Sequence, residues 1–249
     1  MRAIILAAGE GKRLRPYTND RPKCMVEIEG VSLIDRQIKI LKSKGVEEII
    51  IIGGYKSDML EGKGNKLVTN PRYHETNMVW SLFCAEEFLV GDVIISYGDI
   101  VYSSKIISAL VNSNYDISVT IDMNWESYWR DRNEDPLEDA ETLKLRTDGT
   151  IKEIGQKPNS INDIEGQYMG LMKFTNRGIS NLRSTFHKCK KNKSVMGNYP
   201  ENAYMTDLLM QIIYNGVKVH SIPTNSAWVE VDTTNDLESE YTLKRISEI

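Results

Sequence analysis

The sequence predicts the α/β class, with a doubly wound mixed sheet and a small β-rich insertion in its second half. Short apolar runs alternate with amphipathic helical patterns through the first 124 residues, which is the order that βαβ units produce. Residues 49–52 and 93–95 are continuously apolar, as expected for parallel strands covered on both faces. After residue 124 the alternation stops. These observations together predict a Rossmann-like sheet followed by a different local architecture.

The first half is expected to alternate strand and helix. We expect strands where short apolar runs are bounded by turn residues, and helices where apolar residues recur with the helical period. The expected strands are residues 3–6, 48–52, 66–69, 93–96 and 117–123. The expected helices are residues 33–44, 79–88 and 104–112.

The second half has a different texture. Residues 125–138 are charged and show no clear period, and three runs at 142–145, 151–154 and 168–174 then predict strands of a meander. Helical patterns follow over 176–190 and 205–214, and the last expected strands are 218–222 and 228–233. Because no linker rich in Pro, Gly or Ser separates the halves, we expect one domain over residues 1–249.

Charge and cysteine content exclude several classes of protein. The formal net charge is −4 and the pI is near 5.6, so no broad basic surface for nucleic acid is expected. The three cysteines are widely spaced and lack a metal-ligand pattern, which is typical of a reducing compartment. No segment approaches the roughly 18 consecutive apolar residues of a membrane span. We therefore expect a cytoplasmic protein without nucleic-acid or membrane partners, and leave a homo-oligomer open.

The segment after the first expected strand is typical of a phosphate-binding loop. Residues 6–14 read LAAGEGKRL, and Gly9 and Gly11 allow backbone N–H groups to approach a polyphosphate. Arg13 and Lys23 add positive charge, which an anionic transition state at phosphorus requires. A Walker A loop would need a glycine in place of Leu6 and a Ser or Thr in place of Arg13, so it is absent. A dinucleotide fingerprint would need a third glycine in place of Leu14, so hydride transfer to a nicotinamide is disfavoured.

Together with Pro16 and the pair Pro22-Lys23, this loop resembles the pattern L-A-A-G-x-G-x-R-L-x-P followed by P-K. That pattern is found in nucleotidyltransferases of the sugar-nucleotide pyrophosphorylase type. In that family the loop holds a nucleoside triphosphate and the Arg and Lys grip its phosphates. The resemblance thus implies that Arg13 and Lys23 are catalytic. It implies that the loop's nucleotide-binding residues are Leu6, Ala7, Ala8, Gly9, Gly11, Lys12 and Arg13.

Two aspartates far apart in the sequence are candidate metal ligands. Asp99 follows Gly98 just past an expected strand, at the sheet edge where ligands of open α/β sheets bind. Asp232 lies in the last expected strand, where alternation places it on one face with Glu230. Two such carboxylates suit a hard divalent ion shared with triphosphate oxygens. The family resemblance implies that Asp99 and Asp232 hold Mg²⁺ and that Gly98 contacts the nucleotide.

Other segments resemble a narrower branch, the cytidylyltransferases. Residues 77–82 resemble the N-x-x-x-S-L element of choline-phosphate cytidylyltransferases, in which Asn77 and Ser81 would lie by the base and ribose. The acidic segment 135–142 and the segment 204–206 are similar to CTP:phosphoglutamine cytidylyltransferases. The acceptor-binding residues implied by these resemblances, and by the family's Lys-Pro and following strand motif, are Asp139, Glu141, Lys157, Tyr168, Gly170 and Tyr204. Glu230, on one face with Asp232, is a further candidate for binding the substrate.

Physical chemistry adds one expectation about the acceptor. The carboxylates of Asp139 and Glu141 would attract a cationic amine, which a neutral sugar does not carry. By residue type alone, however, a solvated acidic loop is the favoured interpretation of this segment.

The sequence thus predicts a Mg²⁺-dependent cytidylyltransferase. It would transfer CMP from CTP to a small phosphorylated acceptor of the phosphoglutamine, phosphocholine or aminoalkylphosphonate type, releasing pyrophosphate, in capsule or cell-surface polysaccharide modification. Residues 1–124 would form the nucleotide-binding half and residues 125–249 the acceptor-binding half. Two alternatives stay open: a sugar-1-phosphate uridylyl- or thymidylyltransferase, and a catalytically inactive nucleotide-sensing subunit.

Overall fold

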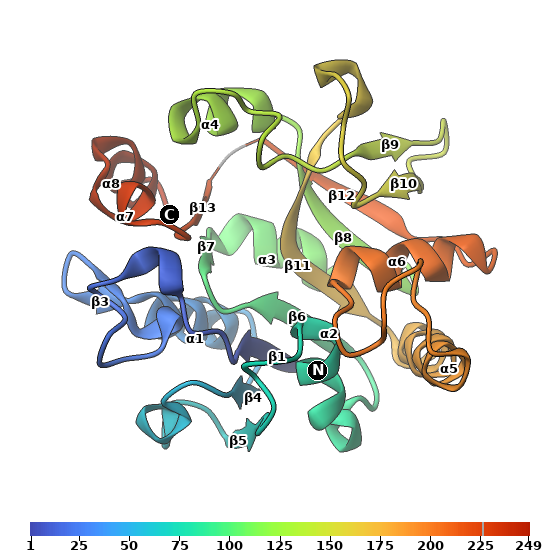
Figure 1. Ribbon diagram of the computed structural model, residues 1–249, viewed down its shortest axis with the longest axis horizontal. Helices are drawn as coiled ribbons and strands as arrows, with labels where there is room; N and C mark the ends of the chain where they lie inside the picture. Colours follow the sequence, from blue (N-terminus) through green and yellow to red (C-terminus); the bar gives the residue numbers. More distant parts are fainter. Residues whose placement is uncertain (226) are drawn as a thin grey trace.

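The computed structural model describes residues 1–225 and 227–249 and contains a seven-stranded central sheet (Figure 1). The strand order is β12-β8-β11-β6-β1-β4-β5. These strands are β1 (Arg2–Ala7), β4 (Glu48–Gly53), β5 (Lys66–Thr69), β6 (Val93–Tyr97), β8 (Ile117–Asp122), β11 (Gln167–Phe174) and β12 (His220–Thr224). All neighbouring pairs are parallel except those of β11, which is antiparallel to both β6 and β8. The predicted mixed sheet is confirmed.

Helices cover both faces of the sheet (Figure 1). On one face lie α2 (Met78–Cys84), α5 (Asn176–Asn192) and α6 (Met205–Tyr214), and on the other lie α1 (Leu33–Ser43) and α3 (Ser104–Val111). Successive strand residues point alternately into the two apolar layers: Ile4 and Ile50 belong to the first, Ile5 and Ile51 to the second. This burial on both sides explains why the strands are continuously apolar in sequence.

The predicted meander of three strands was wrong. β9 (Leu143–Leu145) and β10 (Ile151–Ile154) pair with each other in a two-stranded antiparallel sheet that is separate from the central sheet. β11 instead enters the central sheet, where nearly all its residues are buried. A strand buried on both faces is favoured in the middle of a sheet, whatever its neighbours in sequence.

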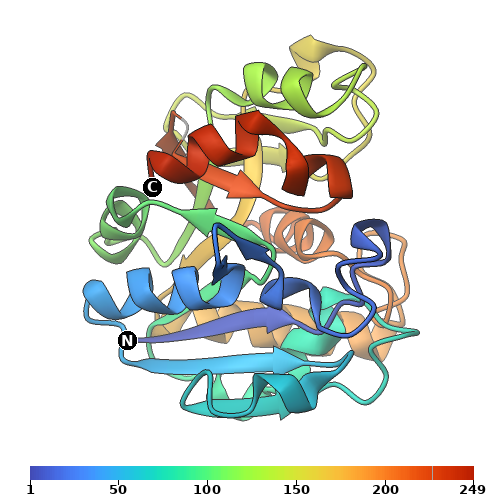
Figure 2. The same cartoon turned by 90° about the vertical axis from the view of Figure 1, so that its left-hand side faces the viewer.

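Several short elements in the second half were not expected. The charged segment after residue 124 contains α4 (Trp125–Arg132), and the chain ends in α7 (Thr234–Glu238) and α8 (Glu240–Ser247). The last expected strand is shorter, β13 (Trp228–Glu230), and pairs with β7 (Ile100–Tyr102) outside the central sheet. Figures 1 and 2 place α4 and the β9–β10 hairpin at the end of the molecule opposite β5. Across residues 1–225 and 227–249, no helix combines the length and apolar character that crossing a bilayer requires.

Candidate active site

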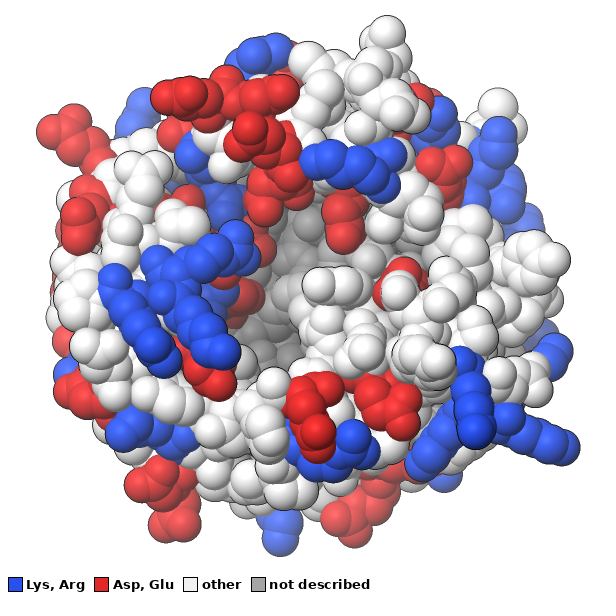
Figure 3. Space-filling model, viewed as in Figure 1, with Lys and Arg blue, Asp and Glu red and all other residues white. Residues whose placement is uncertain are grey.

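One face of the molecule is hollowed in its middle (Figure 3). Basic side chains gather on the left of this hollow in the view of Figure 3, and acidic side chains gather above it. Two cavities, of about 160 Å³ and about 220 Å³, are lined by the residues predicted to bind the two substrates. The site is built at the carboxyl ends of β1 and β6 and on the segments that follow them.

The ends of β1 and β6 touch closely at the first cavity. The amide of Gly98 donates to the carbonyl of Leu6 at 2.8 Å, and a Cβ on Gly98 would lie 2.7 Å from that oxygen. Only glycine therefore fits without separating the two strands. In the loop after β1, Gly11 adopts the left-handed conformation (φ 64°), which a glycine adopts without strain.

The pairing of β7 with β13 brings the two predicted metal ligands together. Glu230 pairs with Ile100, and the amide of Val231 donates to the carbonyl of Asp99 at 3.0 Å. Asp99 and Asp232 thus stand beside each other although they are far apart in sequence. The fully buried Gln37 of α1 steadies this turn because its amide donates to two carbonyls of the β6–β7 segment, at 3.0 and 2.7 Å.

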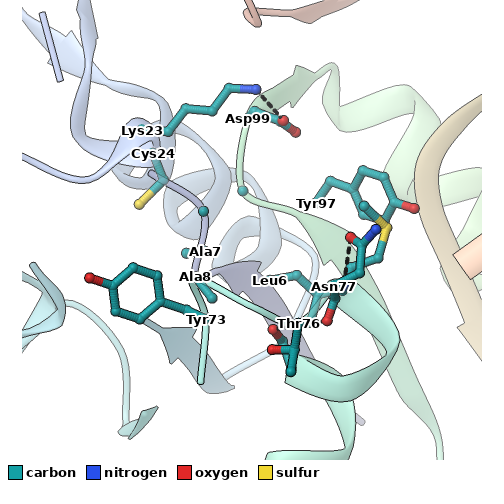
Figure 4. Close-up of a pocket in the computed structure, with 14 residues that line it drawn as sticks. Leu6, Ala7, Ala8, Lys23, Cys24, Tyr73, Thr76, Asn77, Tyr97 and Asp99 are labelled. Carbon is teal, nitrogen blue, oxygen red and sulfur yellow. Dashed lines mark hydrogen bonds and ion pairs between the residues drawn. The ribbon is translucent and has the colours of Figure 1, made fainter. Parts of the chain in front are cut away.

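Lys23 lies between the two aspartates. Its ammonium donates to Asp99 Oδ2 at 2.6 Å and to Asp232 Oδ1 at 2.5 Å, and the contact with Asp99 is drawn in Figure 4. Arg13 donates to the other oxygen of Asp232. Burial acts to lower the pKa of Lys23, but the two carboxylates outweigh it and raise that pKa. Burial likewise acts to raise the pKa of Asp232, while Lys23 and Arg13 lower it. Lys23 and Asp232 therefore face each other as an ammonium and a carboxylate.

The first cavity contains most of the predicted nucleotide-binding residues. The predicted nucleotide-binding residues that line this cavity are Leu6, Ala7, Ala8, Gly9, Asn77, Ser81 and Gly98. Lys23 and Asp99 line it as well. The sequence did not single out five further lining residues, Cys24, Tyr73, Thr76, Met78 and Tyr97. Figure 4 shows Tyr73 and Asn77 on opposite sides of the cavity. Burial raises the pKa of the Cys24 thiol, so this cysteine is not a nucleophile.

Asn77 and Ser81 are positioned by the start of α2. The Asn77 side chain accepts from the amide of Met78 and donates to the carbonyl of Asn202 at 3.4 Å. Ser81 accepts from the buried side chain of Asn70 at 2.9 Å. The loop before α6 therefore closes over the helix that lines the nucleotide side.

The second cavity contains most of the predicted acceptor-binding residues. The predicted acceptor-binding residues that line this cavity are Asp139, Glu141, Tyr168, Gly170, Tyr204 and Glu230. Arg13 and Asp232 line it as well. The two cavities share Met78 and Tyr97, and Lys23 in the first wall bonds to Asp232 in the second. The Asp99–Lys23–Asp232 cluster thus stands where the two cavities meet.

Glu141 is an unusual carboxyl in the second cavity. Burial, together with the neighbouring charges of Asp207, Asp139 and Glu230, raises its pKa to about 7. Gln167, buried at the start of β11, holds its backbone, because the Gln167 amide donates to the Glu141 carbonyl at 2.6 Å. The acceptor cavity therefore has an excess of carboxylates, which a cationic ligand would relieve.

A β-bulge in β11 shapes the same cavity. The pairing of β11 with β8 shifts register between Tyr168 and Met172, and Gly170 within this stretch has φ +74°. A Cβ on Gly170 would lie 2.6 Å from the ring of Tyr97. The bulge thereby allows the Tyr97 and Tyr168 rings to meet edge to face, with centroids 5.7 Å apart.

Some predicted site residues do not line either cavity. Lys157 instead donates to the carbonyls of Leu137 and Glu138. It therefore binds the backbone of the acidic loop and does not line the second cavity. Lys12 pairs with Glu10 at 3.4 Å, and Gly11 shapes the loop without lining the cavity. A role of Lys157 on the acceptor's phosphate stays a prediction without geometric support.

The carboxylates at the junction fit a divalent metal that substrate oxygens also bind. Among the described residues, Asp99 Oδ1 is buried and has no hydrogen-bond partner. No group of three His, Cys, Asp or Glu side chains within residues 1–225 and 227–249 is placed to hold a metal ion. Two carboxylates therefore leave most of a coordination shell for phosphate oxygens and water, as hard divalent ions at nucleotides require.

The chain is similar in sequence to known nucleotidyltransferases. The model of the MobA-like NTP transferase domain family matches residues 3–126. The CTP:phosphoglutamine cytidylyltransferase of Campylobacter jejuni is 41% identical over 251 residues, covering 96% of this chain and 98% of that protein. The chain belongs to this nucleotidyltransferase family, in its cytidylyltransferase branch. Nucleotidyltransferases of this kind generally use a divalent metal and take a nucleotide and a phosphorylated acceptor.

A second relative and a solved structure support the assignment of the chain to the nucleotidyltransferases. The choline-phosphate cytidylyltransferase of Streptococcus pneumoniae is 40% identical over 119 residues, 46% of this chain and 52% of that protein. In solved structures the fold recurs in the inositol-1-phosphate CTP transferase from T. maritima, with a TM-score of 0.76 and 21% identity over 99% of this chain and 95% of that one. The Rossmann-like fold is therefore confirmed.

Proposed function

We propose that this enzyme transfers CMP from CTP to a small phosphorylated acceptor that carries a cationic nitrogen, and releases pyrophosphate. The observation that carries the proposal is the junction of the two cavities at Asp99, Lys23 and Asp232. A nucleotide in the first cavity and an acceptor in the second would meet at this cluster. The name of the Campylobacter jejuni relative supports CTP as the nucleotide.

The chemistry is an in-line displacement at the α-phosphorus. An oxygen of the acceptor's phosphate forms the new bond to phosphorus, while the bond to the oxygen bridging the α- and β-phosphates breaks and that oxygen leaves on pyrophosphate. A phosphate monoester with a second pKa of about 6 is already ionised at neutral pH, so no general base is required. What the site must supply is charge neutralisation between two anions.

Arg13 and Lys23 would supply part of this charge by exchanging partners. Without substrate they neutralise Asp99 and Asp232. When phosphates enter, the ammonium and guanidinium would turn to the phosphate oxygens and free both carboxylates. We propose that Asp99 and Asp232 then hold Mg²⁺, which would neutralise triphosphate charge when bound.

The acceptor side favours a cation beside the phosphate. Asp139 and Glu141 line the second cavity, and the rings of Trp129 and Tyr168 offer aromatic faces nearby. A phosphoglutamine, phosphocholine or aminoalkylphosphonate would match this lining better than a hexose phosphate. We propose that the product serves capsule or cell-surface polysaccharide modification. Division of the chain into nucleotide-binding and acceptor-binding halves, a homo-oligomer and a cytoplasmic location also stay predictions.

The decisive experiment measures pyrophosphate release with each of the four nucleoside triphosphates. Each is combined with phosphoglutamine, phosphocholine, an aminoalkylphosphonate and a hexose 1-phosphate, with Mg²⁺ present. We expect turnover with CTP and at least one nitrogen-bearing acceptor. Turnover only with UTP or dTTP and the hexose phosphate would instead establish a sugar-1-phosphate nucleotidyltransferase. Binding of CTP without turnover on any acceptor would favour a nucleotide-sensing subunit.

A further inference from the structure

A buried ion cluster lies behind Asp232, on the side away from Lys23. Its centre is Arg132, the last residue of α4, whose side chain is only 6% exposed. Its guanidinium donates to Glu230 Oε2 at 2.6 Å and to both oxygens of Asp236, at 2.9 and 3.3 Å. Burial acts to lower the pKa of Arg132, but its carboxylate partners raise it, so the guanidinium is permanently charged.

Asp236 connects this cluster to the backbone of the metal-ligand candidate. Its Oδ2 accepts from the amide of Asp232 at 3.0 Å and from the amide of Thr233 at 2.8 Å. Thr233 is the N-cap of α7, and its side-chain hydroxyl accepts from the Asp236 amide at 3.1 Å. The Asp236 carboxylate therefore fixes the turn from which the Asp232 side chain projects, and Arg132 fixes the carboxylate.

The same helix also holds the chain just before Asp232. The Tyr128 hydroxyl accepts from the amide of Glu230 at 2.7 Å, and the Arg132 guanidinium lies 5.2 Å from the rings of Tyr128 and Trp129. Trp129 itself lines the acceptor cavity. Side chains of α4 thus bond to the chain before Asp232, at Glu230, and after it, at Asp236.

We propose that Arg132 is a positioning residue that holds Asp232, through Asp236, in the orientation required to bind the divalent metal. The inference rests on the proposed role of Asp232 as a metal ligand. A metal with only two protein ligands depends strongly on the fixed direction of each carboxylate. Residues that orient a metal ligand typically change metal affinity by about 10- to 100-fold when removed.

The test measures metal binding without turnover. Mn²⁺ is titrated into the protein in the presence of CTP and absence of acceptor, and the free ion is followed by electron paramagnetic resonance. We expect Arg132→Gln to weaken Mn²⁺ binding about 10-fold or more, and Arg132→Lys to recover part of the loss. Arg130→Gln is the matched control, because Arg130 lies on the same helix and, among the residues that the structure describes, pairs with the exposed Glu126 alone. Equal Mn²⁺ affinities in Arg132→Gln and Arg130→Gln would overturn the proposal.

A second control separates positioning from a general loss of buried structure. Arg245 is also buried and packs on Tyr128 from 4.0 Å, but it donates to the carbonyl of Trp228 and not to Asp236. We expect Arg245→Gln to lower the melting temperature and leave Mn²⁺ affinity within about twofold. If Arg245→Gln weakened Mn²⁺ binding as much as Arg132→Gln, the role of Arg132 would be structural only.

Asp236→Asn keeps the test valid if Arg132→Gln does not fold. We expect it to weaken Mn²⁺ binding as well. The double variant with Arg132→Lys should lose less binding free energy than the sum of the two single losses, because both residues act through one chain of bonds. Unchanged Mn²⁺ affinity in Asp236→Asn would overturn the proposal. A wild-type protein that binds Mn²⁺ with CTP but turns over no acceptor would count against the proposed function alone, whereas one that binds no Mn²⁺ would overturn both.

Discussion

Lys23 is held by two carboxylates that a metal would also need. The ammonium bonds to Asp99 and Asp232 at 2.6 and 2.5 Å, and Arg13 also pairs with Asp232, so two cationic side chains balance two carboxylates. Binding of a metal and a triphosphate adds charges of both signs and allows each group to exchange its partner. A balanced cluster avoids the cost of leaving buried charges unpaired before the substrates arrive.

This balance predicts the effect of removing one carboxylate. In Asp99→Asn and Asp232→Asn the side-chain volume is kept, but the negative charge for the metal is lost. We expect kcat for pyrophosphate release to fall about 100-fold or more in each variant. Steady-state kinetics over a range of Mg²⁺ concentrations provides the measurement. Asp58→Asn, at an exposed aspartate of a surface turn, serves as the control and should keep wild-type rates. Wild-type turnover in both site variants would remove the metal assignment.

Glu141 predicts a pH-dependent cost in stability. Its pKa is raised from an ordinary value of 4.5 to about 7, mainly by burial, so the folded protein binds this proton more tightly than the unfolded chain. The contribution of the Glu141 proton to the stability of the fold is therefore fully present below about pH 4.5, and it is lost as the pH rises through about 7. We expect Glu141→Gln to stabilise the protein by about 1–3 kcal/mol at pH 8 and by almost nothing at pH 5.

Urea unfolding at both pH values measures this difference. Glu138→Gln removes an exposed carboxylate from the same loop and should change stability equally little at pH 5 and pH 8. A gain for Glu141→Gln that is the same at both pH values would mean that Glu141 is ionised throughout. Since Glu141 lines the acceptor cavity, the stabilised variant should also bind a cationic acceptor more weakly.

At the scale of elements, the turn between β6 and β7 is a closely packed part of the site. It carries Asp99, and Gly98 within it touches the end of β1. We expect Gly98→Ala to push β1 and β6 apart, to cost about 1–3 kcal/mol and to lower kcat about 10-fold or more because Asp99 moves. Gly166→Ala is the control, since its nearest neighbours would be at 3.4 Å, an ordinary contact distance. Thermal unfolding and kinetics of both variants test this, and equal behaviour would contradict it.

How far each element could be predicted depended on whether its pattern is local. The glycine loop, Asp99 and the strands of the first half follow from runs that are adjacent in sequence. α4 could not be found in this way, because its buried face combines aromatic rings with Arg132, whose charge is balanced by Glu230 and Asp236. Sequence periodicity detects apolar faces only. A charged side chain that is buried against distant partners is therefore predicted from the sequence to be exposed.

The acceptor side likewise depends on contacts that are not local. Lys157 is predicted from its place before a proline, and in the structure its ammonium donates to two carbonyls of the acidic loop, so its role on the acceptor stays a prediction. Gln167 and Thr206 also line the cavity; both lie within segments that resemble the family, but the sequence does not single them out as site residues. These contacts join segments whose approach is set by the insertion of β11 into the central sheet, and pairing between distant strands is not encoded in any short window.

At the scale of the whole molecule, the chain order and the sheet order are interleaved. β11, from the second half, lies between β6 and β8 of the first, and β13 pairs with β7. Neither half can therefore complete its hydrogen bonds alone. The active site inherits this arrangement, because Asp99 belongs to one half and Asp232 to the other. Loss of the contacts between the halves would also separate the two aspartates.

Interleaving predicts that the full chain unfolds as one cooperative unit. Three of the four tryptophans, Trp125, Trp129 and Trp228, lie in α4 and β13, whereas far-UV circular dichroism is dominated by the central sheet and its helices. In a Trp80→Phe variant, fluorescence therefore reports only the α4–β13 region. We expect its urea transition to coincide in midpoint and slope with the dichroism transition, because β11 and the β7–β13 pair tie that region to the sheet. An earlier fluorescence transition would show that α4 and β13 unfold separately, and Asp232 would then be lost from the site before the sheet melts.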